Sequence, residues 1–313
     1  MNGVSQMTAV QTRVGPVSYS DSGSGPVVVA LHATLHDRRD FDPVAEELRR
    51  RYRFITLDWP GHGESPSLEE SFVHSAALYA DVLTDVVEAL NLPPAVYVGN
   101  SVGGFCAARL SLTHPDRVAG LVLVDTGGFL GGPITNAYCR FLGTPAVTRA
   151  LLPRFIRSYM RARGTDDRAV LDRVTARART DEGVALAAAL WRSFAVGDAN
   201  LRSEARRIAV PTLIVWGSKD TAIPLRFGRR TQSAIPGSRL EVLDTGHLPF
   251  ASRPQEFLGV VEPFLADVLA ADARSSPGSR PISQVCTGSL LCISSQYRRS
   301  ISASAAGRSS PCS

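Results

Sequence analysis

Short apolar runs alternate along the chain with longer segments in which apolar residues recur every three or four positions. The runs predict strands over residues 7–14, 17–19, 27–31, 54–57, 95–99, 120–124, 211–216 and 239–243. The first two form a hairpin around Gly15 and Pro16, and 27–31 and 120–124 have the composition of buried strands. Amphipathic segments predict helices over 40–51, 72–90, 224–235 and 255–270, with another directly after Gly104. Such alternation implies right-handed crossovers and a mostly parallel sheet with helices on both faces.

The alternation stops between residues 126 and 207. This stretch has no convincing strand and contains amphipathic segments such as 148–161, 166–179 and 184–194. Because it follows a central strand, we expect a helical cap over the carboxyl ends of the strands, where ligands bind in open α/β sheets. The alternative is a helical packing layer with no part in gating. We expect the core to comprise 1–127 and 208–273, with the cap at 128–207.

The last part of the chain, residues 274–313, is rich in serine and has no apolar periodicity. This composition predicts a disordered tail, because the segment has too few apolar residues to build a core. A partner-binding tail is the alternative, and a non-structural extension is favoured.

Composition and charge limit the class of protein. A chain of 313 residues with 44% hydrophobic and 20% charged residues can bury one sizeable core. The net charge is +5, but five arginines against one aspartate lie after residue 270, so the remainder is close to neutral. The basic balance is therefore no argument for nucleic acid or a membrane surface, and a small-molecule substrate is expected.

Nothing in the sequence predicts export or membrane insertion. The first residues have no charged region followed by an apolar one, and no apolar run approaches membrane-spanning length. The five cysteines have no regular spacing, which argues against a disulfide framework or a metal knuckle. A cytoplasmic protein is expected, and its oligomeric state is left open.

Candidate chemistry centres on the segment AVYVGNSVGGFCAAR, residues 95–109. An apolar run ends at Gly99, Ser101 follows within the pattern G-x-S-x-G, and a buried helix follows Gly103 and Gly104. This is a strand, a very sharp turn and a helix, with the serine at the apex. Such a turn presents the hydroxyl to a cleft and directs the N–H groups of the new helix towards whatever the serine attacks. Ser101 is therefore the predicted nucleophile.

A serine nucleophile needs a base, and the base needs a carboxylate that orients it. Of six histidines, only His247 lies just past the last predicted strand, so it is the predicted base. Asp220, in the loop after 211–216, is the favoured acid because the following helix leaves it free to face the cleft. Asp125, at the end of 120–124, is the alternative acid.

The developing oxyanion needs N–H donors. One is predicted to be the backbone N–H of Val102, directly after Ser101, and the second the backbone N–H of Thr34, after strand 27–31. His32 and His36 at i and i+4 with Asp37 are a possible metal pattern, but no glutamate follows His32 as in H-E-x-x-H. No metal and no cofactor are expected.

From residue 10 to about 270 the chain resembles an α/β-hydrolase-fold protein of the single-domain, cap-bearing kind. The resemblance is based on His32-Ala33, the Asp58–Ser65 turn (DWPGHGES), the Gly99–Gly103 elbow, the 211–220 segment with Pro224, and Gly246-His247. It implies an eight-stranded sheet with the cap inserted after strand 6, and a triad of Ser101, Asp220 and His247. It also implies that His32 and the Asp58–Ser65 turn brace the oxyanion loop. Family members usually have His-Gly where this chain has His32-Ala33, and alanine narrows the backbone conformations available to the loop that carries the second oxyanion donor.

These residues favour a serine hydrolase that cleaves a carboxylic ester, thioester or lactone of a small molecule through an acyl-enzyme on Ser101. Hydrolysis of a carbon–carbon bond in a vinylogous diketone is an alternative, suggested by the elbow and disfavoured by Leu248, where that subgroup has tryptophan. A cofactor-free perhydrolase would use the same triad. A non-catalytic protein that binds a small molecule in the cap cleft is the alternative from another class.

Overall fold

A computed structural model of the chain describes residues 8–162 and 164–275, which form a three-layer α/β structure around one sheet. The sheet has eight strands in the order β1-β2-β4-β3-β5-β6-β7-β8. The strands are β1 (Thr8–Thr12), β2 (Gly15–Ser22), β3 (Val27–Leu31), β4 (Arg53–Leu57), β5 (Ala95–Asn100), β6 (Val118–Val124), β7 (Thr212–Gly217) and β8 (Arg239–Leu243). The strands β1 and β2 run antiparallel to their neighbours, and the other six are parallel. The predicted mostly parallel, eight-stranded sheet is confirmed.

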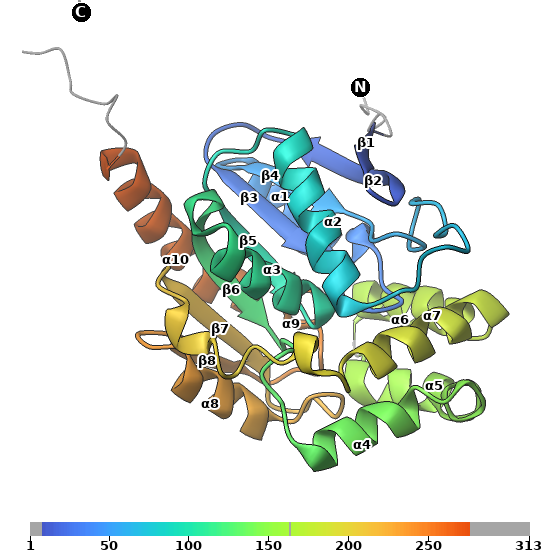
Figure 1. Ribbon diagram of the computed structural model, residues 1–313. Helices are drawn as coiled ribbons and strands as arrows, with labels where there is room; N and C mark the ends of the chain where they lie inside the picture. The colour runs from blue at the N-terminus through green and yellow to red at the C-terminus, as the bar shows by residue number, and fades with distance from the viewer. Residues whose placement is uncertain (1–7, 163, 276–313) are drawn as a thin grey trace, which may run out of the picture. The chain divides into compact units, whose positions relative to one another are not determined.

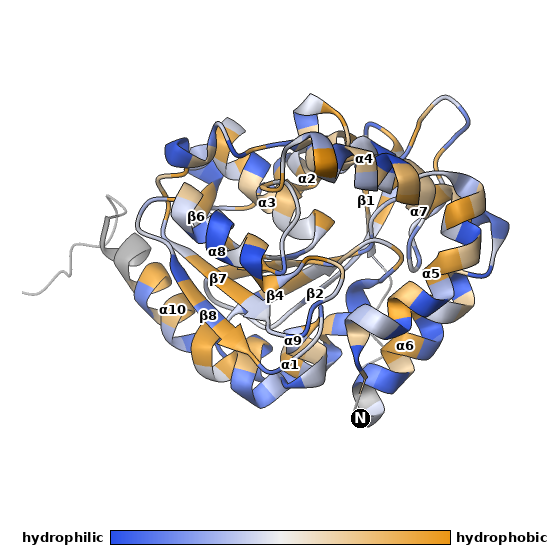
Figure 2. Cartoon of the chain, turned by 90° about the horizontal axis from the view of Figure 1, so that it is seen from below, coloured by the Kyte–Doolittle hydropathy of each residue, from blue (hydrophilic) through white to orange (hydrophobic). Residues whose placement is uncertain are grey.

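Helices cover both faces of this sheet. The core helices are α1 (Asp42–Arg49), α2 (Ala76–Ala89), α3 (Val102–Thr113), α8 (Leu225–Ala234), α9 (Pro249–Ser252) and α10 (Pro254–Ser275). Figure 1 and the turned view of Figure 2 show α2 and α3 on one face and α1 and α10 on the other. Residues of β3, β5 and β7 are buried along the whole length of each strand, as strands covered on both faces require.

The direction of strand addition changes between β3 and β5. The strand β3 pairs with β4 on one side and with β5 on the other, and Leu31 at the end of β3 is level with Gly99 near the end of β5. In open α/β sheets such a reversal leaves a crevice at the carboxyl ends, because the connections on its two sides cross to opposite faces. The loops after β3 and β5 carry Thr34 and Ser101 to this place.

Four further helices lie between β6 and β7: α4 (Pro133–Leu142), α5 (Pro145–Met160), α6 (Thr165–Arg177) and α7 (Asp181–Ser193). Three of them correspond to the predicted segments, and α4 was not predicted. Figure 1 shows all four gathered at one end of the sheet rather than on either face. We call α4–α7 the helical insertion.

Several element boundaries differ from the prediction for local reasons. The hairpin turn lies at Arg13 and Val14, so Gly15 and Pro16 belong to β2. The helix predicted over 72–90 begins at Ala76, because the Ser75 side chain accepts a hydrogen bond from the N–H of Leu78 and caps it there. The helix predicted over 40–51 is divided into a 3₁₀ turn, Arg38–Phe41, and α1.

At the C-terminal side, α10 continues to Ser275, two residues beyond the expected end of the core at 273. Residues 276–313 of the predicted tail lie outside the described residues. Among the helices of the described part of the chain, none has both the length and the apolar content that a transmembrane helix requires.

Candidate active site

Ser101 lies at the apex of a sharp turn between β5 and α3. Its backbone has φ 55° and ψ −114°, a conformation that a non-glycine residue rarely adopts. The turn is possible because the surrounding residues are glycines, which let neighbouring backbone segments approach each other closely. A Cβ on Gly99 would lie 2.4 Å from the carbonyl oxygen of Gly103, and one on Gly103 would lie 2.3 Å from that of Leu31. The predicted strand–turn–helix around Ser101 is therefore present, and the neighbouring backbones hold the serine in its strained position.

His247 and Asp220 are in direct contact. The Nδ1–H of His247 donates to Oδ2 of Asp220 at 2.7 Å, and both residues are buried. The other oxygen of Asp220 accepts from the N–H groups of Ala222 at 2.7 Å and Ile223 at 3.1 Å. These bonds fix the carboxylate and hence the ring orientation, and they assign the proton to Nδ1, which leaves Nε2 as an acceptor.

Asn100 links the serine turn to the histidine loop, a role that the sequence analysis missed. Its side-chain Nδ2 donates to the carbonyl oxygens of Val124 at 3.1 Å and His247 at 3.0 Å. Because Asn100 directly precedes Ser101, these bonds tie the serine turn to the end of β6 and to the backbone of the histidine loop. An amide beside the elbow is the only sequence signal for this link, and the sequence could not specify which strand end the amide would reach.

The loop after β3 is braced by histidines whose rings bind backbone groups. His32 Nε2 accepts from the N–H of Trp59 at 3.0 Å, and His62 Nε2 accepts from the N–H of Leu35 at 3.0 Å. The predicted bracing by His32 and by the Asp58–Ser65 turn is thus confirmed. Burial lowers the pKa of both rings, that of His62 well below its usual value, so both stay neutral acceptors. Leu35, rather than Ala33, adopts the left-handed conformation, at φ 70°.

The two backbone N–H groups predicted as oxyanion donors belong to Val102 and Thr34. Val102 is the first residue of α3, so its N–H has no partner within the helix. Thr34 lines the same cavity as Ser101, and its N–H donates to no other described residue.

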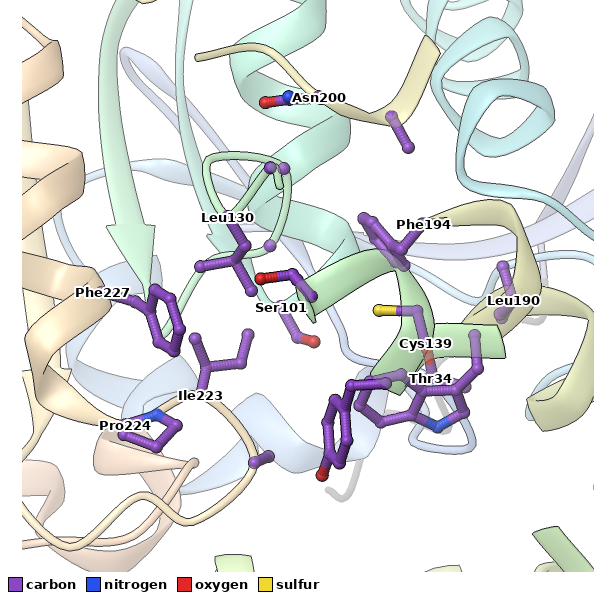
Figure 3. Close-up of a pocket in the computed structure, with 18 of the residues that line it drawn as sticks. Thr34, Ser101, Leu130, Cys139, Leu190, Phe194, Asn200, Ile223, Pro224 and Phe227 are labelled. Atoms are coloured by element: carbon purple, nitrogen blue, oxygen red, sulfur yellow. The ribbon is translucent and has the colours of Figure 1, made fainter. Parts of the chain in front are cut away.

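The cavity beside Ser101 has a volume of about 410 Å³ and is mainly apolar. Its walls come from the loop after β6, from α4 and α7 of the helical insertion, and from the segment around α8. Figure 3 shows Ser101 with Leu130, Ile223 and Phe227 towards one side and Phe194 and Cys139 towards the other. The cavity size suits a small organic molecule.

Asp125, the alternative acid, lies beside the favoured one. A carboxylate oxygen of Asp125, one of Asp220 and a ring nitrogen of His247 lie within 4.8 Å of one another. Oδ1 of Asp125 accepts from the N–H of Gly217 at 3.0 Å, whereas the ring of His247 bonds to Asp220. In the described part of the chain these three are the one group whose spacing suits a metal ion. Nδ1 of His247 and Oδ2 of Asp220 are bonded to each other. We therefore assign the group to a histidine–carboxylate pair rather than to a metal site.

The possible metal pattern in the loop after β3 has a different structure. His36 Nδ1 bonds to Asp40, and its Nε2 lies 3.1 Å from the hydroxyl of Tyr159 on α5. Arg173 on α6 donates to Asp40 at 2.6 Å and to Asp37 at 2.8 Å. Both ring nitrogens of His36 are therefore occupied by protein groups, and the His32 ring binds the backbone. The three residues form no common ligand set.

Comparison with known proteins agrees with this fold. The family model described as alpha/beta hydrolase fold matches residues 26–254. The chain belongs to the alpha/beta hydrolase fold family.

Relatives within the family include esterases. A pimeloyl-[acyl-carrier protein] methyl ester esterase of Chromobacterium violaceum is 31% identical over 248 residues, which cover 75% of this chain and 92% of the relative. The magnesium-chelatase 30 kDa subunit of Rhodobacter capsulatus is 30% identical over 253 residues, 77% of this chain and 88% of that one. The solved structure of a thermophilic esterase from Thermogutta terrifontis has a TM-score of 0.72 at 25% identity and covers 84% of this chain and 99% of its own. These similarities support a hydrolase activity.

Proposed function

We propose that the protein is a serine hydrolase that cleaves a carboxylic ester, thioester or lactone of a small molecule. The Ser101 hydroxyl attacks the carbonyl carbon while Nε2 of His247 takes its proton, and Asp220 stabilises the imidazolium that forms. The proton then passes from His247 to the leaving group, which departs and leaves an acyl group on Ser101. A water activated by His247 releases the acid and restores the serine.

The observation that carries this proposal is the buried bond between His247 and Asp220 next to the strained Ser101 turn. A histidine with its Nδ1 proton held by a carboxylate has its Nε2 lone pair available as a base. Asn100 bonds to the His247 backbone and precedes Ser101, which supports a fixed relation between base and nucleophile.

The N–H groups of Val102 and Thr34 are the proposed oxyanion donors. Both are backbone groups on segments held by the core, so they need little reorganisation when charge develops on the carbonyl oxygen. The positive end of α3 adds to the stabilisation, because Val102 begins this helix.

We also propose that the helical insertion, within residues 128–207, acts as the cap. Its helices α4 and α7 contribute Ile134, Cys139, Leu190 and Trp191 to the cavity wall around Ser101. An apolar wall at this position excludes water from the reacting bond and selects the acyl or alcohol part of the substrate.

Labelling with a fluorophosphonate tests the nucleophile. The wild-type protein and Ser233→Ala, a serine variant on α8 away from the turn, should react, whereas Ser101→Ala should not. Equal labelling of wild type and Ser101→Ala would refute the assignment. The absence of labelling in all three would favour a non-catalytic binding protein.

Hydrolysis of p-nitrophenyl esters of increasing acyl length then tests the reaction class. We expect turnover of short and medium acyl chains, because the cavity is apolar and about 410 Å³. A labelled protein that cleaves no ester but consumes a dienone acid would be a carbon–carbon hydrolase. One that needs hydrogen peroxide for turnover would be a perhydrolase.

A further inference from the structure

The carboxyl group of Asp125 lies in the same buried cluster as Asp220 and His247, and the proposed mechanism does not use it. The residue follows β6, as Asp220 follows the adjacent β7, and its side chain is fully buried. Its backbone adopts φ 42°, and its N–H donates to the carbonyl oxygen of Val215 at 3.0 Å. Neighbouring strand ends therefore present two carboxyl groups to one histidine.

The two carboxyl groups accept different numbers of hydrogen bonds from the protein. Asp220 accepts three hydrogen bonds, from His247 and from the N–H groups of Ala222 and Ile223. Asp125 accepts one, from Gly217, and its Oδ2 has no hydrogen-bond partner among the described residues. Hydrogen-bond donors stabilise a carboxylate, so negative charge resides more favourably on Asp220.

No described Lys or Arg forms an ion pair with Asp125, and the titratable groups that face it are Asp220 and His247. Two neighbouring buried carboxyl groups cannot both ionise without a large repulsion. Burial first, and then the negative charge of Asp220, raise the pKa of Asp125 well above its usual range, against a smaller opposite effect of the Gly217 N–H.

We propose that Asp125 is a reserve carboxyl: a neutral acid in the intact site, and the carboxylate that supports His247 when Asp220 is uncharged. This rests on the proposed function, because it assigns a role beside the same base. In the intact site the neutral Asp125 leaves a single negative charge next to the ring, matched to one imidazolium. Without the charge of Asp220, the repulsion disappears, Asp125 loses its proton to solvent, and its oxygen approaches His247.

The test compares kcat/KM as a function of pH in wild type, Asp125→Asn, Asp220→Asn and the double variant. The asparagine of Asp125→Asn resembles the neutral acid in shape and charge, so its activity should stay within about threefold of wild type. Asp220→Asn should lose about 10²-fold rather than the ~10⁴-fold seen when a triad acid has no substitute. The double variant should lose about a further 10²-fold.

The pH profile separates a reserve carboxyl from a structural role. Activity of Asp220→Asn should rise with pH along a limb displaced to higher pH than in wild type, because burial continues to oppose ionisation of Asp125. The double variant should lack this limb. Equal activity of the double variant and Asp220→Asn, or a loss in Asp125→Asn as large as in Asp220→Asn, would overturn the proposal.

A second measurement does not depend on turnover. The infrared difference spectrum of wild type minus Asp125→Asn at pH 7 should contain the C=O stretch of a protonated carboxyl group. Its absence would overturn the reserve carboxyl even if the enzyme is a serine hydrolase. Its presence in a protein that a fluorophosphonate does not label would leave the protonated Asp125 in place and refute the proposed function instead.

Discussion

Residues 8–162 and 164–275, which the structure describes, contain two buried histidine–aspartate pairs, and the surroundings of the two pairs differ. In one, His247 bonds to Asp220 next to the turn that carries Ser101. In the other, His36 bonds to Asp40, and its remaining nitrogen lies 3.1 Å from the hydroxyl of Tyr159. The pair itself is the same chemistry in both places. What the second nitrogen of each ring can reach decides whether the pair can work as a base.

The charges around the two aspartates also differ. Asp40 receives a hydrogen bond from Arg173 at 2.6 Å, whereas Asp220 is held by backbone N–H groups and the histidine ring. Burial acts to raise the pKa of the adjacent Asp37, but hydrogen bonds and charge from Arg39 and Arg173 outweigh it and hold this pKa well below its usual range. The His36 pair is thus part of a neutralised ionic network that joins α6 to the loop after β3. We infer a structural link there and a proton-accepting pair at His247.

The largest expected effect comes from substituting the histidine of each pair separately. His247→Gln should lower kcat/KM for an ester by roughly 10⁴-fold or more, because the base is lost. The variant should still fold. His36→Gln, the matched variant, should lower the melting temperature and change kcat/KM far less. Steady-state kinetics and thermal unfolding measure both. A comparable kinetic loss in the two variants would remove the distinction between the pairs.

Arg173→Met breaks the ionic network from the side of the helical insertion. It leaves Asp40, which is 1% exposed, without its cation, and this should cost about 3–5 kcal/mol of unfolding free energy. Arg149→Met is the control, because the Arg149–Asp181 pair is exposed and should contribute at most about 1 kcal/mol. Urea unfolding measures both. Equal effects would show that the network does not stabilise the protein.

Tyr159 touches both pairs, through its hydroxyl at His36 and its ring, which lies 5.3 Å from the His247 ring in an edge-on arrangement. Tyr159→Phe removes only the hydroxyl and should cost about 1–2 kcal/mol of stability with kcat nearly unchanged. Tyr159→Ala should in addition lower kcat, because His247 loses its packing partner. A kcat loss of the same size in both variants would be inconsistent with this division.

The smallest effect concerns His32 and His62, whose rings bind the backbone rather than a carboxylate. Their pKa values are lowered by burial, so the unfolded chain binds more protons than the folded protein below about pH 6.5. Stability is complete above that pH and falls as the pH decreases, by at most about 1.4 kcal/mol per pH unit for each ring. Urea unfolding between pH 7.5 and 5 should reveal this slope, and His62→Gln should reduce it. An unchanged slope in His62→Gln would exclude this ring as its source.

Local pattern was sufficient for much of the fold. The apolar run 27–31 coincides with β3, because a short apolar run bounded by turn residues has few other ways to bury its side chains. The segment 239–243 coincides with β8 as well. Element boundaries that depend on a helix cap or on strand register differed from the prediction, as at the start of α2 at Ala76 and of β2 at Gly15. The helix α4 was not predicted although it lines the cavity, because it has only 10 residues and packs against α7, which is distant in sequence.

Local sequence pattern also predicted the candidate site residues in part. Ser101 lies in a motif whose glycines are needed because neighbouring backbone segments approach closely. Asp220 and His247 were predicted because each follows the end of a strand, in the order acid and then histidine. Asp125 was the alternative acid because it occupies an equivalent strand end. The choice between the two depends on which carboxylate receives the Nδ1–H of His247 and the loop N–H groups, and no local pattern encodes these contacts.

The sequence by itself determined the alternation of strands and helices, the sharp turn at Ser101 and the family. These follow from short-range periodicity and from glycines that the backbone requires in place. The tertiary structure decided which of two histidine–aspartate pairs is linked to the Ser101 turn, which carboxylate bonds to His247, and that Asn100 and Tyr159 contact the histidine loop. Such features arise from hydrogen bonds and charges between residues more than twenty positions apart, whose energies depend on distance and burial.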